Sequence, residues 1–137
     1  MNAVIVIPLV GYVGLWLTGS LLFVIYFRLL HIPIDLKHTL EMIQKVPSPL
    51  AIVTVPLCSF ASFFITTRVV VGGSTSVFDN GVLLQIGAVA LVLTIVLDIL
   101  ITVVGEKIDI RKFPVNWMYL LAWLVIIPSI FLASQYQ

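Results

Sequence analysis

The chain contains four long apolar runs, and they limit its fold more than any motif does. The first run extends from Ala3 to Phe27 without a single charged residue. A helix needs about 20 consecutive apolar residues to cross the hydrocarbon core of a bilayer. The sequence therefore predicts an all-α integral membrane protein, in which residues 1–137 form one four-transmembrane-helix bundle. We expect the four spans at approximately 3–27, 49–71, 82–104 and 114–134.

The composition excludes an ordinary soluble domain. Of the 137 residues, 61% are hydrophobic and only 9% are charged, whereas soluble domains have about 25% charged residues. Lipid must therefore solvate most of the surface. A net charge of +1 provides no positive field for nucleic acid, so nucleic acid is not expected as a partner. The single cysteine, Cys58, excludes an internal disulfide.

The basic residues predict how the bundle is oriented in the membrane. Six of the seven Lys and Arg residues lie in the connections 28–48 and 105–113, and Arg68 alone lies toward the other side. Cytoplasmic loops are enriched in Lys and Arg, so we expect these two connections to be cytoplasmic. The connection 72–81 and both termini would then lie on the non-cytoplasmic side.

The first connection, 28–48, is long enough to contain a short helix of its own. Leu36, Leu40 and Ile43 recur at helical spacing, and charged residues are spread around the remaining positions. This pattern is typical of an amphipathic helix that lies along the membrane interface. A Pro-Ser-Pro segment is expected to end this helix before the second span.

Asp98 is a lone acid inside an otherwise apolar span. An acid at this depth costs roughly 2.5–3.5 kcal/mol on insertion scales, so the residue needs a partner or a function. As a structural group, it would hydrogen-bond to Thr94, Thr102 or Thr54, with Arg28 as the nearest cation by depth. As a functional group, it would be a protonatable or cation-binding site in a transport path.

Small and hydroxylated residues gather on one face of each of the first three spans. Such faces allow membrane helices to pack closely and to hydrogen-bond across the contact, so we expect them to point into the bundle. The fourth span lacks such a face, and we expect it to be the most lipid-exposed helix or the one that meets a partner. The inward faces comprise Gly11, Gly14 and Thr18; Thr54, Cys58, Ala61 and Ser62; and Gly87, Ala90, Thr94, Asp98, Thr102 and Gly105.

Two further groups of polar residues are weaker candidates for binding. His31, His38 and Glu41 could hold a metal ion, but both histidines lie near the interface and Pro33 interrupts the helix between them. Contact with solvent or lipid headgroups is favoured for these three. A dense charged cluster follows the third span, and a solvated turn is favoured over a contact with anionic lipid or a cytoplasmic partner. Its members are Glu106, Lys107, Asp109, Arg111 and Lys112.

Three classes of function remain open. The sequence favours a non-enzymatic subunit of a larger membrane complex, because four short spans enclose little cavity and few residues lie outside them. The first alternative is a small oligomeric transporter or channel that uses Asp98. The second alternative is a membrane-embedded enzyme acting on lipid, with His38, Glu41 and Asp98 as the credible reactive groups. Expected partners are membrane lipid and other membrane subunits or a second copy; the cofactor is unknown, and none is expected to be bound covalently.

Overall fold

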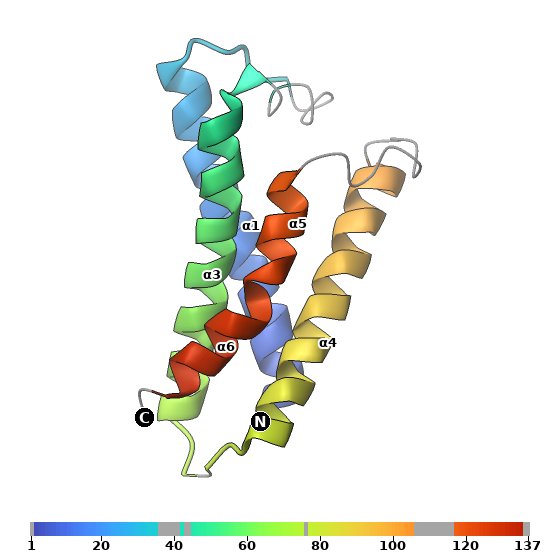
Figure 1. Cartoon of the computed structure of the whole chain (residues 1–137). Helices are drawn as coiled ribbons and strands as arrows, with labels where there is room; N and C mark the ends of the chain where they lie inside the picture. Colours follow the sequence, from blue (N-terminus) through green and yellow to red (C-terminus); the bar gives the residue numbers. More distant parts are fainter. Residues whose placement is uncertain (1, 36–41, 43–44, 76, 106–116, 136–137) are drawn as a thin grey trace.

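The computed structural model of the chain describes residues 2–35, 42, 45–75, 77–105 and 117–135, and every regular element in these ranges is a helix. In chain order the elements are α1 (Ala3–Leu29), α3 (Ser48–Gly72), α4 (Asn80–Ile99), the π-helix η1 (Leu100–Gly105), α5 (Trp117–Leu124) and α6 (Ile126–Ser134) (Figure 1). Helices α1, α3 and α4 are each long and apolar enough to cross a membrane, and the fourth apolar segment is shorter. The prediction of an all-α membrane bundle is confirmed at this level.

Side-chain caps determine where α1 and α4 begin. Asn2 Oδ1 accepts a hydrogen bond from the Val4 N–H at 3.1 Å, and Asp79 Oδ1 accepts one from the Val82 N–H at 2.8 Å. Each cap satisfies an N–H group that the first turn of a helix leaves without a partner. Helix α3 instead has a proline in its first turn, where the missing N–H group is not needed.

The backbones of α1 and α3 approach each other closely at two glycines. The Ser62 hydroxyl donates a hydrogen bond to the Gly11 carbonyl oxygen at 2.7 Å, directly across the contact. A Cβ atom on Gly11 would lie 2.5 Å from ring carbons of Phe63, and one on Gly14 would collide with the Ser62 hydroxyl. The contact therefore requires residues without side chains on α1.

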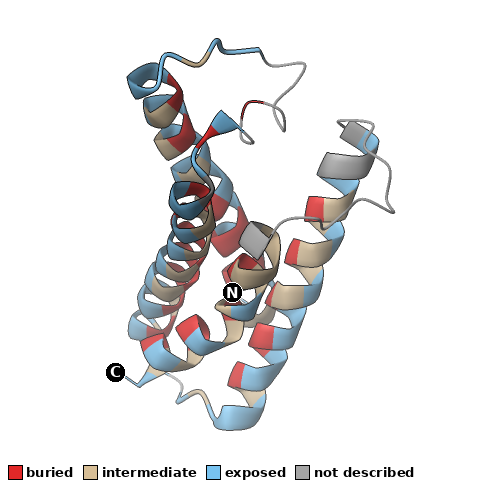
Figure 2. Ribbon diagram, turned by 45° about the horizontal axis from the view of Figure 1, so that its top comes forward, coloured by how far each residue is buried: buried red, intermediate tan, exposed pale blue. Residues whose placement is uncertain are grey.

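The main hydrophobic core lies at the end of the bundle where α1 and α4 begin. Its side chains come from α1, α3, α4 and α6, and the buried residues of these helices face one another (Figure 2). All four helices therefore depend on each other for this core. Its members are Ile7, Phe63, Leu83, Ile86, Ala90, Ile126 and Ile130.

The expectation that the fourth span is the most lipid-exposed helix is wrong for α6. Ile126, Ser129, Ile130 and Ala133 are all 0% exposed, and α6 lies between α3 and α4 (Figure 1). The physical reason is a break in the helix before Pro128. A proline ring clashes with the carbonyl four residues earlier, so the helix restarts with the proline in the first turn of α6. After the break, α6 takes a new direction into the space between its neighbours.

The opposite end of the bundle contains a second, smaller core, and α1 ends there in a tight reversal. His31 has a φ of 55°, and the Ile32 N–H donates a hydrogen bond to the Phe27 carbonyl oxygen at 2.8 Å. This is the pattern of a Schellman C-cap. The ends of α4 and α5 diverge at this end of the bundle (Figure 1). The second core comprises Phe23, Phe27, Met42, Val46 and Ala51.

Several predicted segments fall only partly within the described residues. Of the predicted interfacial helix, Met42 and Lys45 are helical, whereas Leu36, Leu40 and Ile43 lie outside the described residues. Residues 106–116, which include most of the third connection, also lie outside them. The interfacial helix therefore stays a prediction.

Candidate functional site

Asp98 lies on the face of α4 that points into the bundle. The side chain is only 5% exposed, and the helix widens into η1 at Leu100, two residues later. Such π-helical turns occur frequently at functional sites. The buried residues of α4 follow the spacing of a single helix face and are Leu83, Ile86, Gly87, Ala90, Thr94 and Asp98.

Two aromatic side chains hold the Asp98 carboxylate. Tyr12 Oη, on α1, donates a hydrogen bond to Oδ1 at 2.9 Å, and Trp123 Nε1, on α5, donates one to Oδ2 at 2.8 Å. Hydrogen bonds to a charged group contribute about 1.5–3 kcal/mol each. Two of them are sufficient to offset the roughly 2.5–3.5 kcal/mol that an acid costs inside a membrane. Neutral donors from two other helices therefore stabilise the acid.

The threonines expected to bond to Asp98 have other surroundings. Thr54 Oγ1 lies 2.9 Å from Tyr26 Oη and also donates to a carbonyl oxygen of its own helix, so Thr54 joins α3 to α1. Thr94 Oγ1 is buried and has no hydrogen-bond partner among the residues that the structure describes. The side chain of Thr102 lies outside the described part of the chain. Neither of the two described threonines therefore bonds to the carboxylate.

Arg28 is also too far along α1 to pair with Asp98. It lies in the last turn of α1, whereas the carboxylate bonds to Tyr12, near the beginning of the same helix. At 1.5 Å per residue, these two positions on α1 are roughly 24 Å apart along the helix axis, beyond the reach of an arginine side chain. In the sequence, Asp98 lies close to the end of the third apolar run and Arg28 directly follows the first, which suggested that the two residues lie at similar depths in the membrane.

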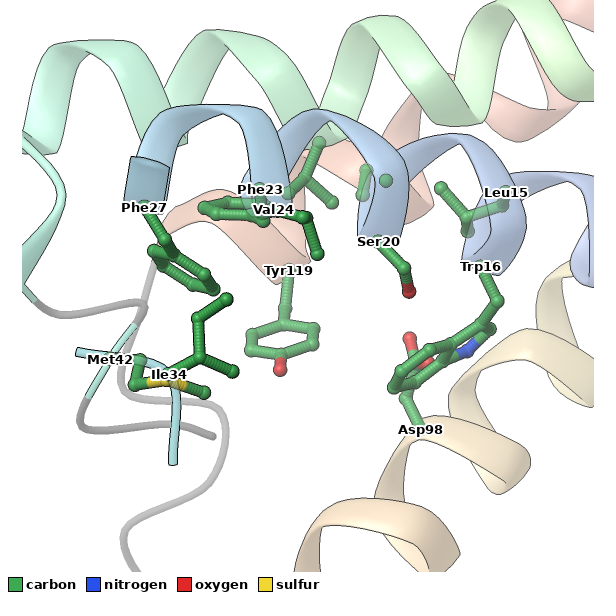
Figure 3. Close-up of a pocket in the computed structure, with 13 residues that line it drawn as sticks. Leu15, Trp16, Ser20, Phe23, Val24, Phe27, Ile34, Met42, Asp98 and Tyr119 are labelled. Atoms are coloured by element: carbon green, nitrogen blue, oxygen red, sulfur yellow. The ribbon is translucent and has the colours of Figure 1, made fainter. Parts of the chain in front are cut away.

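A cavity of about 220 Å³ begins at Asp98 and extends along α1. Asp98 and Trp16 lie at one end, Ile34 and Met42 lie at the other, and the ring of Tyr119 lies between the two ends (Figure 3). Among the described residues that line the cavity, Asp98 is the only charged one. Most of the lining residues come from one side of α1: Leu15, Trp16, Gly19, Ser20, Phe23, Val24 and Phe27.

The cavity is open at the side of the bundle. Trp16, Val24 and Ile34 line it, yet they are 37%, 39% and 52% exposed. Trp16 and Val24 lie on α1, well inside the apolar run, at a depth where lipid would surround the bundle.

The predicted metal candidates do not form a site within the described residues. His31 is exposed at the end of α1, and His38 and Glu41 lie outside the described residues. In the part of the chain that the structure describes, no group of three or more His, Cys, Asp or Glu could hold a metal ion. The charged cluster from Glu106 to Lys112 lies outside the described residues as well, so its role stays a prediction.

The sequence interpretation identified the acid but missed its two donors, Tyr12 and Trp123. A usable signal was present, because both residues lie inside apolar runs rather than at the interface where aromatic belts form. A buried O–H or indole N–H needs an acceptor, and Asp98 is the strongest acceptor available in the spans. The pairing itself depends on how the helices are rotated, which the sequence does not determine.

The site combines an acceptor, its aromatic donors and an apolar wall. An ionised carboxylate accepts about four hydrogen bonds; Tyr12 and Trp123 use one on each oxygen of Asp98, and Trp16 is a further side-chain donor. The remaining acceptor capacity can take a bond from one more donor. The arrangement is therefore suited to binding a donor group at the end of an apolar body.

Comparisons with protein-family models, with curated proteins and with solved structures find no match for this chain.

Proposed function

We propose that this chain is a small membrane transporter that binds a mainly apolar molecule in the cavity at Asp98. The observation that carries the proposal is a carboxylate at the inner end of an apolar cavity, oriented by Tyr12 and Trp123. A purely structural acid needs only its hydrogen bonds, whereas this acid also forms the wall of a space large enough for a ligand. Acids inside membrane spans mark substrate and ion pathways unusually often.

The size and lining of the cavity support ligand binding. Its volume of about 220 Å³ exceeds that of the engineered apolar cavity of about 150 Å³ that binds benzene. Apolar walls with a few convergent polar groups are typical of small-molecule sites. The opening at the side of α1 supports loading from the bilayer.

Transport also requires a route to the other end of the bundle. In this structure, the main hydrophobic core closes that route, because Ile7, Phe63 and Ile86 are fully buried there. We propose that α4 and α1 separate at this core during transport, because Ile7 of α1 and Ile86 of α4 both belong to it. The cavity would then open alternately to the two sides.

The proposed orientation places both termini and the connection 72–81 on the non-cytoplasmic side. The distribution of Lys and Arg supports it. The beginning of α1 and the end of α6 also lie at the same end of the bundle (Figure 1), as an even number of crossings requires. The connection 28–48, with its predicted interfacial helix, and the connection 105–113 are then cytoplasmic. The cavity opens in the cytoplasmic half of the bilayer.

The subunit role favoured by the sequence stays a prediction, and it is compatible with transport by an oligomer. Native mass spectrometry after gentle purification separates the possibilities. A homo-oligomer is expected for a transporter of this size, whereas stoichiometric foreign subunits would favour the complex. The lipid-enzyme alternative depends on His38 and Glu41, which lie outside the described residues.

Gly19 allows a sharp test of ligand binding. It lines the cavity, and nothing lies within 4 Å of a Cβ atom placed on it, so Gly19→Leu should fill the space without separating the helices. Bromobenzene quenches tryptophan fluorescence on contact, and Trp16 lines the same cavity. We expect saturable quenching in nanodiscs containing the wild-type protein and loss of the saturable component in Gly19→Leu. Gly72→Leu is the matched control, because its Cβ also meets open space but lies outside the cavity.

Transport is tested in proteoliposomes loaded with a panel of labelled small amines, alcohols and carboxylic acids. At least one compound should leave with saturable kinetics from vesicles containing the wild-type protein or Gly72→Leu, and not from those containing Gly19→Leu. Equal quenching of the wild-type protein and Gly19→Leu would show that the cavity is not a binding site. Binding without saturable efflux of any compound would contradict the transport role.

A further inference from the structure

We infer that the ligand of the cavity is a small lipophilic ammonium ion, an inference that rests on the transport function proposed above. The first argument is charge. Among the described lining residues, Asp98 is the only charged one, and its donors Tyr12 and Trp123 are neutral. Among the described residues, no cation therefore pairs with the carboxylate. In a medium of low dielectric constant, an ionised carboxylate attracts a cation and repels an anion strongly.

The second argument is hydrogen-bond capacity. Tyr12 and Trp123 each use one lone pair of the Asp98 carboxylate, Trp16 is a further side-chain donor beside it, and about one lone pair remains. The Ser20 hydroxyl, another acceptor, points into the cavity at the same end (Figure 3). An ammonium group has several N–H donors and no acceptor. The inner end of the cavity therefore offers the acceptors that an ammonium group needs.

The third argument is the aromatic lining. Trp16, Phe23, Phe27 and Tyr119 contribute rings to the wall of the cavity (Figure 3). Aromatic faces attract cations, most strongly where the cation is desolvated, and they also pack well against apolar groups. Rings near Asp98 would stabilise the ammonium group, and rings farther along α1 would contact the rest of the molecule.

The fourth argument is size. A cavity of about 150 Å³ holds benzene, so a cavity of about 220 Å³ holds a molecule of roughly nine non-hydrogen atoms by proportion. This is too small for a phospholipid, whose headgroup would also lie at the interface rather than beside Asp98. A bare divalent cation is disfavoured as well, because it requires about six or more oxygen ligands. An amine with a compact apolar body fits the volume, the acceptors and the side opening.

Three probes that share a phenyl ring test this inference. Phenethylammonium carries the cation, n-propylbenzene is its neutral isostere of equal size, and phenylpropanoate, which is two non-hydrogen atoms larger, carries a negative charge. Binding is measured by equilibrium dialysis against nanodiscs, with empty nanodiscs subtracting partition into lipid. We expect the wild-type protein to bind phenethylammonium at least tenfold more tightly than n-propylbenzene, and phenylpropanoate more weakly than either. This order needs no variant, so it does not depend on whether a substituted protein folds.

Variants then assign the effect to named groups. Asp98→Asn keeps the shape and removes the charge, so it should weaken phenethylammonium binding at least tenfold and abolish the preference for phenethylammonium over n-propylbenzene. Ser20→Ala should weaken phenethylammonium binding several-fold and reduce the same preference. Gly19→Leu should remove the binding of both probes.

The outcomes separate this inference from the transport proposal. Equal affinity for phenethylammonium and n-propylbenzene, with both lost in Gly19→Leu, would overturn the ammonium class and leave the ligand cavity in place. Tighter binding of phenylpropanoate would overturn the ammonium class as well. Absence of protein-dependent binding for all three probes, together with unsaturable bromobenzene quenching, would overturn both proposals.

Discussion

At the scale of single residues, hydrogen bonds from two aromatic side chains replace the water that would otherwise solvate the Asp98 carboxylate. Tyr12 and Trp123 each have only two side-chain torsions to order, so fixing these hydrogen bonds loses little conformational entropy. Both donors are neutral, so no second buried charge has to be desolvated. The acid is thus stabilised by rigid dipoles rather than by an ion pair.

Removing one donor should therefore destabilise the protein measurably. Tyr12→Phe keeps the ring and deletes the hydroxyl, and we expect it to lower the free energy of unfolding by about 1.5–3 kcal/mol, as for hydrogen bonds to charged groups. Tyr26→Phe is the matched control, because its hydroxyl bonds to the neutral Thr54 hydroxyl and such bonds contribute about 0.6 kcal/mol in membrane helices. Denaturant titration in micelles measures both. Equal losses would argue that the carboxyl is not charged.

The end of α1 contains a residue in an unfavourable backbone conformation. His31 has a φ of 55°, and the left-handed region costs a residue with a Cβ atom roughly 1–2 kcal/mol. His31→Gly should therefore raise the free energy of unfolding by about 1 kcal/mol. Leu30→Gly, at a φ of −92°, is the control and should lower stability. A melting temperature of His31→Gly below that of the wild type would contradict this interpretation.

At the scale of helices, the contact between α1 and α3 depends on a position that has no room for a side chain. A Cβ atom on Gly11 would lie 2.5 Å from the fully buried ring of Phe63, so that the ring or the helix must move. The contact also contains the hydrogen bond from Ser62 to the Gly11 carbonyl oxygen. Separating the helices would therefore weaken packing and hydrogen bonding together.

Gly11→Ala should lower the free energy of unfolding by about 1–3 kcal/mol, the usual range for overpacking a core. Gly19→Ala, on the same helix, should have no destabilising effect, because nothing lies within 4 Å of its added Cβ. Thermal unfolding of the two variants in the same detergent gives the comparison. A Gly11→Ala protein as stable as Gly19→Ala would show that α1 and α3 are less closely packed than described.

The positions of the first three apolar helices could be predicted from the sequence, whereas the packing of the fourth segment could not. Helices α1, α3 and α4 with η1 begin and end within two residues of the predicted apolar spans, because run length and capping residues set those limits. For α6, the apolar composition indicated lipid exposure, but Leu and Ile are equally suited to a core. Only the neighbouring helices determine that Ile126 and Ile130 are buried.

The candidate site could be predicted in part, for the same kind of reason. Asp98 was identifiable because a charge inside an apolar run is expensive wherever the helices lie. Its donors were not, because Tyr12, Trp16 and Trp123 become neighbours of Asp98 only through the rotation of separate helices. The cavity was missed too, since small residues such as Gly19 indicate close packing as readily as open space.

At the scale of the whole molecule, the Lys and Arg distribution predicts the orientation of the bundle. In a Cys58→Ala background, a cysteine in place of Ser74 should react with an impermeant thiol reagent added outside cells. A cysteine in place of Ile110 should react only after the membrane is permeabilised, because six of the seven Lys and Arg residues lie in its loop and in the first connection. The opposite labelling pattern would reverse the orientation and place the cavity in the other half of the bilayer.

The hydrogen bonds of Asp98 also imply an order of assembly during synthesis. Tyr12 is already in the membrane when α4 leaves the ribosome, whereas Trp123, 25 residues after Asp98, is still enclosed in the ribosomal exit tunnel. Helix α4 therefore enters the bilayer with only one of its two aromatic donors available. Each Leu, Val or Ile contributes about 0.3–0.6 kcal/mol to the free energy of membrane insertion. The cost of the incompletely hydrogen-bonded acid therefore cancels the contribution of several of these residues. A released chain that ends before Trp123 would hold α4 in the membrane less firmly than the finished protein, and the last segment to be made secures the one before it.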